Sequence, residues 1–419
     1  MDKAIKNVRM KVKNIFTVTV PVLMLTVLLG SCIRENIIYV DDVTSRTVFV
    51  YMAADNNLNG YVDDNINQMK MSVSKMPYKA NLIVYVDRLK AKPMLLNVKF
   101  EKIDTIKVFP ELNSSSADTF EMIFREVKHR WPADKYGLLM WSHGTGWIPK
   151  SQLHNVAWNL GYAPARDGRQ ALSPIYERIP DIRDPFAPTK TFGFERDANG
   201  NYLCIELDEL AAVIPDKEFE FIIFDACYMG CVEVAYALRN KTEYFVSSSV
   251  EILGQGFPYY ETTPFMMEGD MNNVCKKFFE HYDRKSGWER TGGISLVKTA
   301  ELDKLASSFN KIVAQWPDSI DINESSLQCF DRFSGHHTFF DMVDVAEHMC
   351  SDPTLLNEFL LQTERCIKYA ASTPYVLEGD PLQITIDKYC GLSMYFPFTY
   401  NKALNEEYRK TSWSVATGL

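Results

Sequence analysis

Five short runs of mostly apolar residues recur before residue 250, and they limit the fold more than any other feature. They lie at 47–55, 81–87, 136–144, 219–227 and 242–249. Their apolar residues are continuous rather than alternating, which is the pattern of strands covered by helices on both faces. Amphipathic stretches separate them, such as 118–131, where Asp118 and Glu121 hold capping-box positions. The sequence therefore predicts an α/β fold with a mostly parallel central sheet and right-handed crossovers.

The same pattern divides the chain into parts. Residues 47–265 form the expected α/β domain, with a long insert at 148–203 that is rich in Pro, Asp, Arg and Asn. An insert of this length is typical of a functional loop. Residues 266–419 are more helical, and we expect them to pack on the first domain and extend it. Their clearest helical spacing is that of Leu302, Leu305, Phe309, Ile312 and Trp316.

The first 32 residues differ in composition from the rest. A basic head, a short apolar segment and small residues at its exit predict a signal peptide over 1–31. Leu29-Gly30-Ser31-Cys32 resembles the lipobox of bacterial lipoproteins, which implies acylation of Cys32 and leaves 32–46 as a tether. An ordinary signal peptide with an incidental Cys32 is the alternative. We expect an exported protein with a lipid anchor in the cell envelope, and Ile33 favours the outer membrane.

Composition excludes several functions. The net charge is −9, and outside the first 13 residues no block of Lys and Arg indicates a nucleic-acid binder. The cysteines after Cys32 are scattered without a CxxC pair, so the sequence demands neither a disulfide framework nor a zinc site. There is no G-x-S-x-G elbow, Walker loop or H-E-x-x-H motif. We expect a monomer that requires no cofactor.

Two reactive side chains follow buried-strand patterns. His143 comes after "LLMWS", and Cys227 comes after "FIIFDA". Ligands gather at the carboxyl ends of strands in open parallel sheets. If these two strands are neighbours, the imidazole and the thiol face each other, as a thiol protease requires. The alternative is that Cys227 is an inert packing residue; its combination with His143 favours catalysis.

The neighbours of these residues suit the same chemistry. The segment after Cys227, "YMGCVEVAYALRN", predicts a helix whose amino end would favour the thiolate. Because glycine lets a carbonyl approach the backbone, the amides of Gly144 and Cys227 are candidates for an oxyanion hole. His143 would protonate the leaving amine. His336 or His337 is a competing partner for the thiol, but adjacent His residues on a strand point to opposite faces and indicate structural or surface roles.

A family resemblance rests on these segments. "LLMWSHGTGW" and "FIIFDACYMGCVEVAYAL" resemble the two signature blocks of the clostripain-like cysteine peptidases, in the clan of caspases and gingipains. "VYMAADNNL", "SSSVEILGQGFPY" and "GLSMYFP" agree, so the resemblance runs from about residue 47 to residue 400. It implies a caspase-like α/β sandwich with a His/Cys dyad at His143 and Cys227. The function expected is that of a cysteine endopeptidase.

The resemblance also implies cleavage after Arg or Lys in protein or peptide substrates, with acids in the S1 pocket. Asp225 matches one such position, and Glu251 is a second candidate. Asp225 could instead, or in addition, cap the following helix. A catalytically silent, lipid-anchored binding protein on the same fold is the alternative to a peptidase.

Two further properties of relatives are self-cleavage in the loop between the dyad strands and activation by calcium. The insert offers basic sites for cleavage: Lys150, Arg166, Arg169, Arg178, Arg183, Lys190 and Arg196. Calcium binding is possible, but the insert's acids lack EF-hand spacing, so no metal ligands are assigned. These acids are Asp167, Asp181, Asp184 and Asp197.

Overall fold

The computed structural model describes residues 44–73, 80–152, 192–196, 202–316, 322–332, 336–381 and 383–419. The predicted signal peptide, Cys32 and most of the insert lie outside these residues, as do the four insert acids and five of the seven basic insert residues. Thr44–Leu419 forms one compact unit. No helix in the described part of the chain has the length and apolar character needed to cross a membrane.

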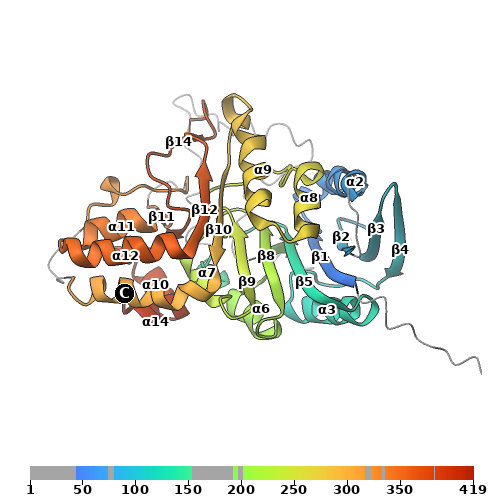
Figure 1. Cartoon of the computed structure of the whole chain (residues 1–419), viewed down its shortest axis with the longest axis horizontal. Coiled ribbons are helices and arrows are strands. Elements are labelled where there is room, and N and C mark those ends of the chain that lie inside the picture. Colours follow the sequence, from blue (N-terminus) through green and yellow to red (C-terminus); the bar gives the residue numbers. More distant parts are fainter. Residues whose placement is uncertain are drawn as a thin grey trace, which may run out of the picture. The chain divides into compact units, whose positions relative to one another are not determined.

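A nine-stranded sheet runs through this unit, with the order β12-β10-β9-β8-β5-β1-β2-β3-β4 (Figure 1). The five strands from β9 to β2 are parallel, and antiparallel strands extend the sheet on both sides. The strands are β1 (Thr44–Ala54), β2 (Ala80–Arg88), β3 (Met94–Lys99), β4 (Lys102–Val108), β5 (Ala133–Trp141), β8 (Phe219–Asp225), β9 (Thr242–Ser247), β10 (Gly293–Lys298) and β12 (Ile367–Ser372). Three strand pairs lie outside it: β6 (Phe192–Arg196) with β7 (Tyr202–Ile205), β11 (Phe340–Asp341) with β15 (Ser393–Met394), and β13 (Tyr375–Val376) with β14 (Ile384–Thr385).

Helices cover the two faces of the sheet in two groups (Figure 1). The first group is α2 (Val62–Ser72), α8 (Tyr259–Glu268) and α9 (Met271–Asp283). The second is α3 (Ala117–Arg130), α6 (Leu207–Val213), α7 (Val232–Ala237), α10 (Leu302–Val313), α12 (Pro353–Cys366) and α14 (Ser412–Thr417). Two more helices, α11 (Met342–Met349) and α13 (Lys402–Tyr408), belong to the C-terminal region.

Strand β1 shows why the predicted strands are apolar throughout. Its residues from Val48 to Ala54 are at most 1% exposed, because both of its faces are covered. Phe49 stacks on Phe124 of α3, with ring centroids 5.9 Å apart, while α8 contacts the strand as well. The predicted mixed α/β fold with a mostly parallel sheet is therefore confirmed.

Two local predictions were wrong. Asp118 and Glu121 form no capping box, because α3 already begins at Ala117 after Ser116. In the segment 391–397, Ser393–Met394 pairs with β11. The backbone of this segment also binds the region after Cys227, since Ser393 N donates to Gly230 O (2.9 Å) and Tyr395 N donates to a carboxylate oxygen of Glu233 (2.8 Å).

The helix expected directly after Cys227 was the second wrong prediction. Helix α7 begins only at Val232, with Cys231 as its N-cap. Tyr228 has φ 58°, in the left-handed region, and therefore interrupts any helical run from Cys227. The amino end of α7 consequently lies four residues beyond the thiol and is no direct source of thiolate stabilisation.

Candidate active site

His143 and Cys227 follow two adjacent strands. β5 and β8 pair in parallel, and their register ends with Trp141 opposite Asp225. Each candidate residue lies two positions beyond that last pair, at the carboxyl edge of the sheet. Ser142 N also donates to Asp225 O (3.4 Å), so the two chains stay together past the strands. The structure thus brings the two segments to one rim.

Gly144 is in direct contact with the segment that carries the thiol. A Cβ added at this glycine would lie 2.8 Å from the Cβ of Ala226 and 2.9 Å from the carbonyl oxygen of Cys227. Both distances are shorter than ordinary van der Waals contact. The two loops therefore pack at the level of their backbones, which requires a residue without a side chain at position 144.

Asn57 orients the imidazole, a role that sequence reasoning missed. It begins the 3₁₀ helix η2 (Asn57–Tyr61) just after β1, and its Oδ1 lies 2.6 Å from Nε2 of His143. An amide oxygen only accepts, so Nε2 carries the proton and Nδ1 keeps a lone pair. Burial among neighbouring atoms lowers the pKa of His143 to about 4, so the ring is neutral near pH 7. The signal was present in "AADNNL", the polar residues that follow the first strand.

Cys227 is held against the loop that follows β9. Its Sγ lies 3.3 Å from Ile252 N and 3.5 Å from Ile252 O. Burial raises the pKa of the thiol to about 12, and the negative charge of Glu251 adds to this effect. The side chain is nevertheless partly exposed to solvent. The thiol is therefore protonated at rest, and a nearby base would be needed to convert it to the thiolate.

Asp225 lies buried beneath the site. Its Oδ2 accepts hydrogen bonds from Phe257 N (3.0 Å) and from the hydroxyl of Tyr259 (2.5 Å), while the described residues give Oδ1 no hydrogen-bond partner. Burial raises the pKa of this carboxyl to about 6. The predicted capping role was wrong, because the next helix begins too far along the chain. Gly256 (φ 69°) is required here, since a Cβ would lie 2.3 Å from Oδ2.

Glu251 is already paired within the chain. Arg332 donates to both of its carboxylate oxygens, from Nη2 at 2.7 and 2.9 Å and from Nε at 3.1 Å. The hydroxyl of Tyr228 donates to Glu251 Oε1 (2.9 Å). Glu251 therefore joins the residue after Cys227 to the C-terminal region, a connection that sequence reasoning also missed.

Strand β6 of the central insert contacts the loop that carries His143. In β6, Gly193 N donates to His143 O (3.3 Å), and Phe192 forms a bridge with Gly144. Glu195 of the same strand is 5% exposed and its Oε1 has no hydrogen-bond partner among the described residues. The backbone of the histidine loop is thus supported by the insert.

The two other histidines considered have local partners. His336 is exposed and pairs with Glu324 (2.9 Å). His337 pairs with Asp331 (2.9 Å). Burial, the largest single influence, opposes the charge of His337, but Asp331 and Cys329 together outweigh burial and raise its pKa to about 11. Each of these histidines is therefore held by a carboxylate of the C-terminal region.

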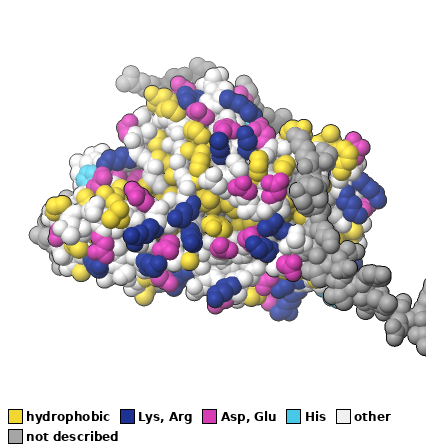
Figure 2. All heavy atoms as spheres, in the orientation of Figure 1, with side chains coloured by type: hydrophobic (Ala, Val, Ile, Leu, Met, Phe, Trp, Pro, Cys, Tyr) yellow, Lys and Arg dark blue, Asp and Glu magenta, His cyan; other side chains and the backbone are white. Residues whose placement is uncertain are grey.

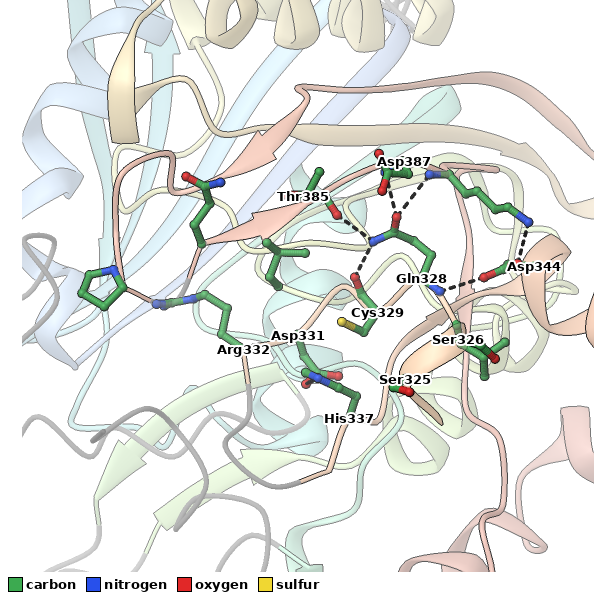
Figure 3. Close-up of a pocket in the computed structure, with 15 residues that line it drawn as sticks. Ser325, Ser326, Gln328, Cys329, Asp331, Arg332, His337, Asp344, Thr385 and Asp387 are labelled. Atoms are coloured by element: carbon green, nitrogen blue, oxygen red, sulfur yellow. Dashed lines mark hydrogen bonds and ion pairs between the residues drawn. The ribbon is translucent and has the colours of Figure 1, made fainter. Parts of the chain in front are cut away.

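An open pocket of about 650 Å³ lies in the C-terminal region, lined by Arg332, His337 and Gln328 but not by His143 or Cys227 (Figure 3). Gln328 bridges its wall, donating to Thr385 O (3.0 Å). Figure 3 shows the Arg332 side chain directed away from this Gln328 network. Within the described residues no group of three His, Cys, Asp or Glu side chains could hold a metal ion.

The surface carries no strong charge of one sign on the face shown in Figure 2, where Lys and Arg are interspersed with Asp and Glu. All eight cysteines in the described residues are free. The chemistry available at the carboxyl edge of the sheet is consequently that of one thiol, one neutral imidazole and the surrounding amides and carboxylates.

Comparison with known proteins identifies relatives of this arrangement. A family model described as "Clostripain family" matches residues 50–170 and 181–358. Clostripain of Hathewaya histolytica is 27% identical over 264 residues, and the match covers 54% of this chain and 44% of that protein. The chain thus matches less than half the length of that curated relative.

Solved structures are similar over nearly the whole chain. An inactive zymogen C11 protease from Parabacteroides distasonis is 29% identical, with a TM-score of 0.73 over 90% of this chain and 98% of that one. A secreted C11 cysteine protease from Bacteroides thetaiotaomicron is 26% identical, with a TM-score of 0.73 over 89% of this chain and 99% of that one. The chain belongs to the clostripain family of cysteine peptidases.

Proposed function

We propose that the chain is a cysteine endopeptidase in which Cys227 is the nucleophile and His143 the general base and acid. The observation that carries this proposal is the pairing of β5 with β8, which supports a thiol and an Asn57-oriented imidazole at one rim. The neutral states of both groups fit the chemistry, because the base must have a free lone pair before attack.

The reaction follows from these groups. Nδ1 of His143 takes the proton from Cys227 as the sulfur attacks the scissile carbonyl carbon, and the carbonyl oxygen becomes an oxyanion. The amides of Gly144 and Cys227 are the proposed donors to that oxygen, where one donor lowers the barrier by about 3 kcal/mol. The imidazolium then protonates the leaving amine. Water, deprotonated by His143, hydrolyses the thioester and releases the thiol.

The substrate class is a second part of the proposal. Asp225 Oδ1, with no partner among the described residues, could receive a guanidinium or ammonium at P1 through a charge-assisted hydrogen bond. Glu251 remains a candidate for the same pocket only if Arg332 releases it. We therefore propose cleavage after Arg or Lys, with Asp225 as the principal acid.

Maturation and location complete the proposal. One of the similar structures is that of an inactive zymogen, which supports maturation of this chain, in our proposal by self-cleavage within 148–203. The lipobox-like segment before Cys32 supports export and a lipid anchor, with the outer membrane favoured by Ile33. Mass spectrometry of the mature N-terminus tests the anchor: a free Cys32, or a start elsewhere, would contradict it.

Hydrolysis of short fluorogenic peptides ending in Arg or Lys tests the activity. Cys227→Ala and His143→Ala should each abolish turnover, while Cys350→Ser and His129→Ala, which change residues away from the site, should retain it. The protein should be assayed before and after limited tryptic nicking. A folded protein without turnover in either state would favour the alternative, a silent lipid-anchored binding protein.

A further inference from the structure

A buried ion pair connects the C-terminal region to the loop of the nucleophile. The side chains of Arg332 and Glu251 are 6% and 14% exposed, and three hydrogen bonds join them. Arg332 also approaches Asp380 at 3.9 Å. Removing one member of such a pair leaves an uncompensated charge in a site of low dielectric. Arg332 and Glu251 therefore depend on each other for charge compensation.

Glu251 acts on Cys227 through two neighbours. It directly precedes Ile252, whose backbone N and O both contact Sγ. Its Oε1 receives the hydroxyl of Tyr228, the residue after Cys227, whose backbone is left-handed (φ 58°). The Tyr228 ring stacks on Phe339, with centroids 5.1 Å apart and planes at 9°. The carboxylate thus fixes the chain on both sides of the sulfur.

We propose that Arg332 is a positioning residue of the active site. It neutralises Glu251 and holds it in place, so that the loop of Cys227 keeps its conformation and the thiol of Cys227 can lose its proton. The inference rests on the proposed function. It gives the C-terminal region a part in catalysis, although none of its described residues is a dyad member. It also makes Glu251 a support of the loop rather than a binding site for the P1 cation.

The charges around the thiol set the expected direction of each change. Asp225 and Glu251 oppose the thiolate, while Arg332 favours it, and His143 lies on the facing loop. Asp380 lies 3.9 Å from Arg332, and Asp331 directly precedes Arg332 in the chain. Arg332 therefore offsets part of the rise that Glu251 causes in the pKa of Cys227. Removing the charge of Arg332 should therefore lower the fraction of Cys227 present as thiolate, and removing the charge of Glu251 should raise it.

The test measures carboxamidomethylation of Cys227 by iodoacetamide in the mature chain, followed by mass spectrometry of its peptide. At mildly alkaline pH the rate follows the thiolate fraction. Arg332→Gln should slow modification, and Glu251→Gln should accelerate it, each by about three- to tenfold. The double variant should return close to the parent rate. Arg290→Gln, which breaks a pair with Asp283 elsewhere, should change nothing.

Equal slowing in both single variants would overturn the proposal, because a merely structural pair loses stability and order whichever partner is removed. Thermal unfolding of every variant separates this case from charge effects. If Arg332→Gln does not fold, Glu251→Gln and the double variant still show whether removing the charge of Glu251 speeds or slows the modification of Cys227. This readout needs no turnover, so it is independent of whether the parent protein cleaves peptides.

Peptide kinetics distinguish positioning from specificity. Arg332→Gln should lower kcat by a similar factor for peptides with basic and with neutral P1 residues. Were Glu251 the P1 acid, releasing it would instead lower KM for basic peptides alone, and that result would refute a positioning role.

Discussion

At the residue scale, close contacts between atoms, rather than strong interactions, determine the geometry of the site. Gly144 allows two loops to touch, Asn57 selects one tautomer of His143, and Gly256 leaves room for the carboxylate of Asp225. Apart from the backbone amide of Gly144, a proposed donor to the oxyanion, none of these three residues takes part in the proposed reaction. Each of them decides where a reacting or binding group lies.

Gly144→Ala should lower activity at least tenfold and the free energy of unfolding by about 1–3 kcal/mol, because the new methyl group would overlap the backbone of Cys227. Peptide hydrolysis and denaturant unfolding measure the two effects. Gly60→Ala is the matched control, since a Cβ there meets no atom within 4 Å. Full activity in Gly144→Ala would contradict the close packing of the two loops.

Asn57→Asp should raise the pKa of His143, because a carboxylate beside Nε2 favours the imidazolium that burial otherwise opposes. The acidic limb of kcat/KM against pH should then move to higher pH. Asn57→Ala removes the acceptor without adding charge and should reduce kcat about tenfold or more through loss of orientation. An unchanged pH profile in Asn57→Asp would mean that this contact does not control the imidazole.

At the scale of elements, strand β6 places a buried carboxyl group, that of Glu195, inside the fold. Glu195 is buried near Asp87, whose Oδ2 accepts from Ser114 (2.6 Å) and whose Oδ1 has no hydrogen-bond partner among the described residues. Burial raises the pKa of Asp87 to about 7 and that of Glu195 to about 8, and the charge of Asp87 adds to the second shift. The other ionisable groups facing them are Asp55, Glu111, Tyr51 and Tyr85.

These shifts predict a pH dependence with a definite sign. In an unfolded chain both carboxyls titrate near pH 4, so between about pH 4 and 8 the folded state holds more protons. Their contribution to the free energy of unfolding therefore falls as pH rises through this window. Glu195→Gln should reduce the difference between the free energies of unfolding at pH 5 and at pH 8. Glu101→Gln, at an exposed position, should leave this difference unchanged. A steeper dependence in Glu195→Gln would contradict the burial of an uncharged carboxyl.

The elements also show what sequence could and could not reveal. The five predicted strands were found because strands buried on both faces must be apolar throughout. The β3–β4 hairpin was missed, since its exposed residues, among them Lys99 and Lys102, break that pattern. The same limit explains Arg332, whose partner lies 81 residues away and whose surroundings leave no local signal.

At the scale of the whole molecule, strand order brings the two residues of the proposed dyad together. Sequence placed His143 and Cys227 after two strands, but only the pairing of β5 with β8 makes them neighbours. The contributions of the C-terminal region, β10 and β12 in the sheet and Arg332 beside Glu251, depend on contacts between distant segments. Such contacts follow from packing, for which hydrophobic spacing alone carries no information.

The adjacency of β5 and β8 has a consequence for a chain that has been cut. Cleavage of the backbone within 148–203 places His143 and Cys227 on two separate polypeptides. The parallel pairing of β5 with β8 and the core on both sides of the sheet nevertheless remain intact. The two pieces should therefore elute together in size-exclusion chromatography under native conditions. Because every cysteine in the described residues is free, they should separate in denaturing electrophoresis even without a reducing agent.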